Sequence, residues 1–191
     1  MYAREVAGRE LTFLVSGKLW RNSLIMQDEE TGTLWSHVTG EALEGELAGT
    51  TLEVVESVQT DWRSWRDRYP GTRLLVKDTT ITGSRYADYL DDPERTGLFR
   101  ARWLTGRLPG KTLVYGIHVG PHAAAVTDGF LSGGRAREIE LGDRTVHVRR
   151  GEDGGVRAWL GTGDGQTEPI DVLEVFWFAW SGFYPHTEVY D

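Results

Sequence analysis

Residues 62–72 read W-R-S-W-R-D-R-Y-P-G-T, and residues 177–187 read W-F-A-W-S-G-F-Y-P-H-T. Both segments follow the pattern W-x-x-W-x-x-x-Y-P-x-T, with two tryptophans, a Tyr-Pro pair and a threonine at the same spacing. Such an internal match indicates a duplicated structural unit. The repeat therefore divides the chain into two related parts. It indicates how the fold is organised and does not indicate a reaction.

The first copy predicts a short amphipathic helix. Trp62, Trp65 and Tyr69 recur at helical spacing and share one face. A polar residue ahead of them, Thr60 or Asp61, is suited to cap the helix, and the proline after Tyr69 ends it. The arginines among these residues face away from the aromatic side chains.

The second copy is apolar on every side over residues 176–180, which read F-W-F-A-W. A helix of that composition is buried all round, although a strand is also compatible with so short an apolar run. We therefore expect the second copy at the centre of the fold and the first copy nearer its edge.

A second pair of matched places lies ahead of the two motifs. Residues 30–33 have the chemistry of a tight turn and precede Trp35, and the glycine-rich residues 151–155 precede Trp159. Trp35 and Trp159 are therefore expected to occupy comparable places. Six of the eight tryptophans then fall in matched positions.

The chain contains 24 glycines and only 6 prolines, spread between short apolar runs. This pattern predicts many tight turns and a mainly β fold, with α+β as the alternative. We expect one domain of two pseudo-repeated lobes, each with hairpins and a short Trp-bearing helix. The lobes span about residues 1–77 and 110–191, and an irregular connection over residues 78–109 joins them. Residues 112–127 predict a hairpin that has no counterpart in the first lobe.

Composition excludes several classes of function. The net charge of −8 argues against binding to nucleic acid or to an anionic membrane, and the absence of cysteine excludes disulfides and thiol chemistry. No apolar run approaches the length of a transmembrane helix, and the polar N-terminus is unlike a signal peptide. A soluble, cytoplasmic protein is expected, and no motif implies a cofactor.

Residues 16–26 and 30–35, followed by Thr39-Gly40-Glu41-Ala42, resemble the bacterial and archaeal domain of unknown function 3179 family. The family pattern is similar to S-G-x-L, then L-x-M-x-D-x-x-T-G-S-x-W and T-G-E-A. The close of the chain, residues 176–187, resembles the family ending. The resemblance implies a fold and assigns no biochemistry.

Typical members of that family carry a His-Glu motif and a Cys-Pro-x-Cys motif upstream of the matching segment. Neither motif occurs in this sequence, so no metal or redox role is carried over. The first lobe is then expected to lack the hairpin that residues 112–127 give the second. A missing hairpin leaves an open sheet edge, which proteins usually cover. We therefore predict a homodimer, or a partner chain that covers this edge.

Two sets of polar residues are candidates for chemistry. His118 and His122 lie four residues apart around a Gly-Pro turn and are candidate metal ligands, although a zinc site needs at least three protein ligands. His37 and Glu41 flank Thr39-Gly40 and are a candidate catalytic pair, with the imidazole as base and the carboxylate as its orienter. Surface turn histidines and a polar loop rim are the structural alternatives.

Two other stretches favour structural roles. The acidic residues 28–30 lack the alternating carboxylates of a calcium loop and are typical of a solvated hairpin tip. Residues 161–165, G-T-G-D-G, lack the Lys-Ser/Thr ending of a phosphate loop and favour an ordinary loop.

The aromatic side chains are the largest potential source of buried or binding surface in the chain. They favour a shared core at the junction of the lobes, and a ligand-binding groove or a dimer surface are the alternatives. The candidates are Trp35, Trp62, Trp65, Trp177, Trp180 and Tyr184. The function predicted from the sequence is a non-catalytic binding or assembly module, and the alternative is a metal-dependent or hydrolase-like enzyme built around His37 and Glu41.

Overall fold

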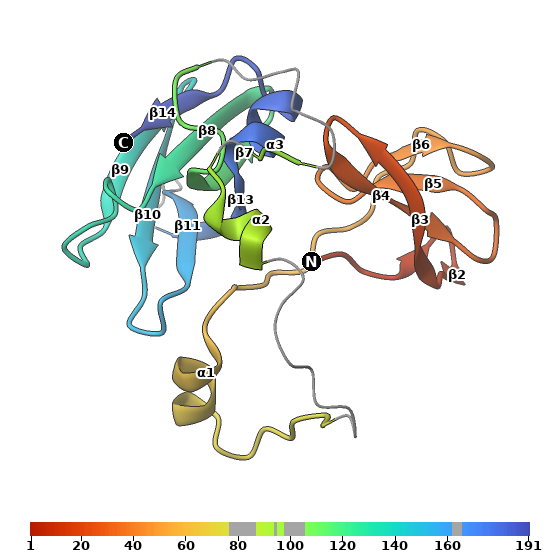
Figure 1. The fold of residues 1–191 in the computed structure, drawn as a ribbon, viewed down its shortest axis with the longest axis horizontal. Coiled ribbons are helices and arrows are strands. Elements are labelled where there is room, and N and C mark those ends of the chain that lie inside the picture. Colours follow the sequence, from red (N-terminus) through yellow and green to blue (C-terminus); the bar gives the residue numbers. More distant parts are fainter. Residues whose placement is uncertain (77–86, 94, 98–105, 162–165) are drawn as a thin grey trace.

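The computed structural model describes residues 1–76, 87–93, 95–97, 106–161 and 166–191. These residues are mostly β and form four sheets and three short helices, which confirms the predicted fold class (Figure 1). No helix in the described ranges is long and apolar enough to cross a membrane. The predicted connection over residues 78–109 falls largely outside these ranges, and its described part contains helix α2 (Ala87–Asp91).

The first lobe is an antiparallel meander that packs one face onto a small core. Its sheet has the order β3-β4-β5-β6, and a separate two-stranded hairpin, β1-β2, lies beside it. The core contains Leu11 and Trp35, both fully buried, with Val6, Ala42 and Leu52 around them. The strands are β1 (Glu5–Val6), β2 (Arg9–Glu10), β3 (Phe13–Trp20), β4 (Ser23–Asp28), β5 (Leu34–Ser36) and β6 (Ala42–Glu44).

Local sequence fixes the first two turns of this meander. Arg21 and Asn22 join β3 to β4 with φ values of 49° and 65°, the positive values of a two-residue type I′ hairpin. Gly32 takes φ 71° in the next turn, as its place in the predicted turn requires. Gly17 has φ 75° and lies inside β3, where the pairing register with β4 shifts.

The turn between β4 and β5 is built around a buried carboxylate, so the prediction of a wholly solvated acidic tip is wrong at its first residue. Asp28 is only 1% exposed and accepts hydrogen bonds from the Trp35 indole at 2.8 Å and the Thr31 amide at 2.6 Å. Burial alone would raise the pKa of Asp28, but these hydrogen bonds hold it below its ordinary value. The D-x-x-T-G sequence and the tryptophan after it thus form one structural unit.

The second lobe is a sandwich of two four-stranded sheets. One sheet has the order β13-β7-β8-β14 and the other β12-β11-β10-β9. Their facing sides form the largest core, in which Ile117, Val126, Leu141, Val146 and Val148 are almost fully buried. The strands are β7 (Leu113–Val119), β8 (His122–Thr127), β9 (Arg137–Leu141), β10 (Arg144–Arg150), β11 (Val156–Gly161), β12 (Thr167–Ile170), β13 (Leu173–Phe176) and β14 (Glu188–Tyr190).

Helix α3 (Trp177–Phe183) covers the other side of the sheet β13-β7-β8-β14 (Figure 1). It contains the second motif copy, so the helical interpretation of residues 176–180 is confirmed from Trp177 on. All seven of its residues are buried. The indole of Trp180 lies directly on Gly116, where an added Cβ would come within 2.3 Å of the ring. The helix can approach the sheet this closely only because β7 has no side chain there.

The expected equivalence of Trp35 and Trp159 is wrong. Trp35 faces the core and is fully buried, whereas Trp159 is partly exposed on β11. Trp159 alternates with the buried Ala158 and Leu160, so its ring lies on the outer face of the sheet, stacked on His147 at 5.9 Å. The two turns are similar in composition, but their tryptophans point to opposite sides of their sheets.

We predict that Gly116→Ala lowers the free energy of unfolding by about 3 kcal/mol, because the new methyl group would overlap the buried indole of Trp180 and force the helix away from the sheet. Urea denaturation measures this loss. Gly71→Ala is the matched control, since an added Cβ at Gly71 meets nothing within 4 Å. Equal stability of the two variants would contradict the close packing of α3.

Candidate functional site

The two motif copies adopt the same local conformation. Helix α1 (Trp62–Arg68) is the first copy, and Asp61 caps it by accepting from the Ser64 amide at 3.0 Å, as predicted. In both copies the second tryptophan donates its indole N–H to the closing threonine at 3.0 Å. The tyrosine amide donates to the carbonyl of the second tryptophan at 2.8 Å in one copy and 2.9 Å in the other. The eleven-residue pattern therefore encodes a self-contained helix and cap.

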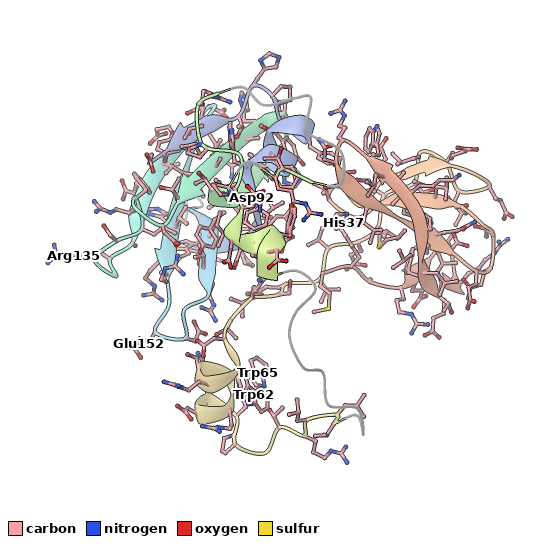
Figure 2. All side chains as sticks on the ribbon, viewed as in Figure 1. His37, Trp62, Trp65, Asp92, Arg135 and Glu152 are labelled. Carbon is pink, nitrogen blue, oxygen red and sulfur yellow. The ribbon has the colours of Figure 1, made fainter. Side chains whose placement is uncertain are left out.

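The surroundings of the two copies differ completely. Trp177 and Trp180 are 0% and 2% exposed, whereas Trp62, Trp65 and Tyr69 are 45%, 37% and 44% exposed. Helix α1 has no buried residue. Figure 2 shows Trp62 and Trp65 on a helix that projects away from both sheets of the second lobe. The expected difference in burial is thus confirmed, and of the aromatic candidates only the first motif copy is largely exposed.

The sheet that buries α3 shows what α1 lacks. Strand β13 ends directly before α3 and pairs with β7. Strand β14 follows α3 and pairs with β8. The β7-β8 hairpin therefore lies between the two segments that flank the helix. The flanking segments of α1 are residues 58–61 and 73–76, and neither belongs to a strand in the described structure.

The segment after α1 has the apolar character of a buried strand, yet it is exposed. Leu74, Leu75 and Val76 are 63%, 87% and 77% exposed. Residues 73–75 occupy the place of β14, since each segment begins directly after the closing threonine of its motif. Together with Trp62, Trp65 and Tyr69, the three exposed aliphatic side chains form an apolar surface that we call the α1 surface. Contiguous exposed apolar side chains of this kind mark interaction sites.

Helix α1 is held by the second lobe through one carboxylate. Asp153, in the β10–β11 turn, accepts from Arg157 at 2.6 and 2.9 Å and from Arg68 of α1 at 3.3 Å. The Thr60 hydroxyl donates to the carbonyl of Asp153. The hydrogen bonds from Arg157 lower the pKa of Asp153 to about 2.

The two lobes hold each other's helices in a reciprocal way. The β10–β11 turn of the second lobe contacts Arg68 near the end of α1. The β3–β4 turn of the first lobe contacts the end of α3, where Arg21 donates to the Gly182 carbonyl at 3.0 Å. Gln59 and Glu174 hold equivalent places ahead of the two helices and lie 3.3 Å apart. Contacts between equivalent positions are typical of a two-fold arrangement.

The candidate metal ligands do not converge. His118 pairs with Ala123 on the side of the β7-β8 hairpin that faces α3, whereas His122 pairs with Val119 on the opposite side. No group of three potential metal-ligating side chains comes together among the described residues. His118 instead lies edge-on to Tyr184, with ring centroids 5.7 Å apart.

The candidate catalytic pair is not joined by any hydrogen bond or ion pair within the part of the chain that the structure describes. Nδ1 of His37 lies 2.9 Å from the Leu24 carbonyl, and since a carbonyl only accepts, this nitrogen carries hydrogen. Glu41 is exposed and directly precedes β6. The pair therefore has the geometry of loop residues.

A crevice at the junction of the lobes was not predicted from the sequence. A small cavity of about 30 Å³ and a neighbouring crevice of about 390 Å³ share His118, Asp171 and Val54. Burial, with the nearby Asp171 and Tyr184, raises the pKa of Tyr2 to about 12, so its phenol stays neutral and donates to the Val38 carbonyl at 3.0 Å. Tyr2 and Asp171 belong to no motif, so no sequence signal pointed to them.

Comparison with known proteins adds a family and no activity. The family model described as "Protein of unknown function (DUF3179)" matches residues 1–187 of the 191, as the resemblance of the motifs predicted. No curated protein and no solved structure matches the chain.

We predict that Trp62→Ala changes the free energy of unfolding by less than about 0.5 kcal/mol, whereas Trp177→Ala lowers it by about 3–5 kcal/mol. The two residues are equivalent in the motif, and only Trp177 is buried. Chemical denaturation of both variants measures the difference. Similar losses would show that α1 is covered in the isolated chain.

We predict that Asp153→Asn lowers the free energy of unfolding at pH 7 by about 2 kcal/mol, the equivalent of the fall in its pKa from 3.8 to about 2. Because the folded-state pKa is the lower one, this stabilisation is present above about pH 4 and is lost as the pH falls towards 2. Urea denaturation at pH 7 and at pH 2.5 tests this. Glu152→Gln, at the exposed neighbouring position, is the control and should have little effect at either pH.

Proposed function

We propose that this chain, which belongs to the DUF3179 family of unknown function, is an assembly module whose α1 surface is covered by a second polypeptide. One observation carries the proposal: the same eleven-residue motif is buried under a sheet in one lobe and exposed in the other. Exposed tryptophan and tyrosine side chains are the residues most enriched at binding hot spots.

The size of the α1 surface supports this role. Its six large side chains expose roughly 500–900 Å² of mostly apolar area, if each presents about 150–250 Å² when fully exposed. A standard interface buries about 800 Å² on each partner. The α1 surface is therefore large enough to form the centre of a stable interface.

The charge of the same region also favours a protein partner. Residues 61–76 contain four arginines and two aspartates, in a chain whose net charge is −8. A basic segment on an otherwise acidic protein favours a partner with an acidic surface. The enzymatic alternative has less support, because His37 bonds a backbone carbonyl and no interaction within the described residues joins it to Glu41.

We predict that the protein isolated gently from its source has a mass above the 21.5 kDa of one chain, and that Trp65→Ala returns it to that mass. Light scattering measures both, and a photo-reactive p-benzoylphenylalanine in place of Trp62 identifies the chain that lies against α1. Trp159→Ala, on the outer face of the second lobe, is the control and should keep the larger mass. A wild-type protein of 21.5 kDa from its source, with no cross-linked chain, would overturn the proposal.

A further inference from the structure

We infer that the polypeptide covering the α1 surface contributes an antiparallel β-hairpin, which inserts between residues 58–61 and residues 73–76 beneath α1. This inference rests on the assembly role proposed above, and it names the chemistry of the partner. The template is the second lobe, where β7 and β8 fill the equivalent place between β13 and β14 under α3.

The flanking segments are suited to receive such a hairpin. Asp61 has φ −79° and ψ 154°, close to the −71° and 143° of Phe176, which occupies the same place at the end of β13. Residues 58–61 and 73–76 form no strand pairing within the described structure. Their backbone groups can therefore pair with an added hairpin, which is a recurrent mode of protein recognition.

Side chains of the receiving surface match both faces of the sheet that would form. Leu74 and Leu75 correspond to Val189 and Tyr190 of β14, which pack on opposite sides of their sheet. Consecutive apolar residues are typical of strands buried on both faces. Exposure of both leucines in the isolated chain therefore indicates a strand that lacks its neighbour.

The template also fixes which residues the hairpin presents to α1. The face of β7-β8 towards α3 contains Val114, Gly116 and His118 on one strand and Ala123 and Ala125 on the other, and His118 lies beside Tyr184, beyond the end of the helix. Because Trp65 has the same conformation as Trp180, the strand beneath it needs glycine at the position of Gly116. The partner hairpin thus has small residues facing the two tryptophans of α1.

A second copy of this chain does not fit as the donor. Its β7-β8 hairpin has this pattern but is already buried between α3 and the second-lobe core, with Val114, Ile117 and Ala125 fully buried. Donating it would uncover Trp177 and Trp180 to cover Trp62 and Trp65, with no net gain in buried surface. A second copy is thus excluded as the donor, and the inference commits to a hairpin from a different polypeptide.

The test uses a copy of residues 112–127 as the probe, fused ahead of Met1 through about sixteen Gly/Ser residues, which span roughly 20–24 Å. The amino group of Met1 bonds Ser57 at 3.0 Å, so the tether starts beside residues 58–61 and gives a high effective concentration. We expect amide hydrogen exchange over residues 58–76 to slow at least tenfold. The matched control carries Gly116→Val in the graft alone, where the added side chain meets Trp65, and should give no protection.

A second graft guards against a probe that does not form a hairpin. Tyr115→Cys and Val126→Cys within the graft join two directly paired positions that face away from the helix, and the chain has no other cysteine. Protection by this graft, and its loss with Gly116→Val, support the inference. Protection by neither graft, or equal protection with glycine and valine, overturns it.

The two proposals can fail separately. If the native complex exists but neither graft protects residues 58–76, the partner covers α1 in another way and the hairpin inference is wrong. If the protein from its source is a single chain of 21.5 kDa and the glycine graft docks, the hairpin chemistry stands and the assembly role falls.

Discussion

The contact between the indole of Trp180 and the bare backbone of Gly116 determines how the second lobe is built. It lets α3 lie close enough to β7 and β8 for Trp177 and Trp180 to be buried against Val114, Ala123 and Ala125. The sheet beneath is then covered on both sides, by the helix on one and by the strands β9 to β12 on the other. A sheet buried on both faces needs apolar or small residues at successive positions, and β8 supplies them as a run of three alanines.

The two copies of the motif separate what is local in this fold from what is not. The cap, the indole bond to threonine and the turn at the Tyr-Pro pair are the same in both, because each depends on residues at most seven positions apart. Burial depends on a hairpin that only the second lobe provides. The same eleven-residue pattern therefore produces a core element in one place and an exposed helix in the other.

The reciprocal contacts between the lobes hold the ends of both helices, although the aromatic face of α1 is exposed. Asp153 holds Arg68 from the second lobe, and Arg21 holds the end of α3 from the first. These polar contacts fix the helix ends and leave the apolar face of α1 uncovered. A preformed surface of this kind loses less conformational entropy on binding than a flexible one, which favours association.

Most of the β architecture could be predicted from the sequence. Glycine spacing, the turn at residues 30–33, the Asp61 cap and the unmatched hairpin at residues 112–127 are local signals, and all are present in the structure. Local patterns did not predict which face of a sheet a side chain occupies. Trp35 and Trp159 follow similar turns, but Trp35 faces the core and Trp159 faces outwards. A shift of one residue in register reverses a side chain, and turn composition does not encode it.

The sequence by itself determined that the chain has two related helices with aromatic faces, and it indicated which of them is the more apolar. Only the tertiary structure decided that the first helix stays exposed, that His118 and His122 lie on opposite faces, and that Tyr2 and Asp171 line one cavity at the junction. The physical reason is distance along the chain. Caps and turns are set by neighbours a few residues apart, whereas burial is set by strands that arrive from far away in the sequence.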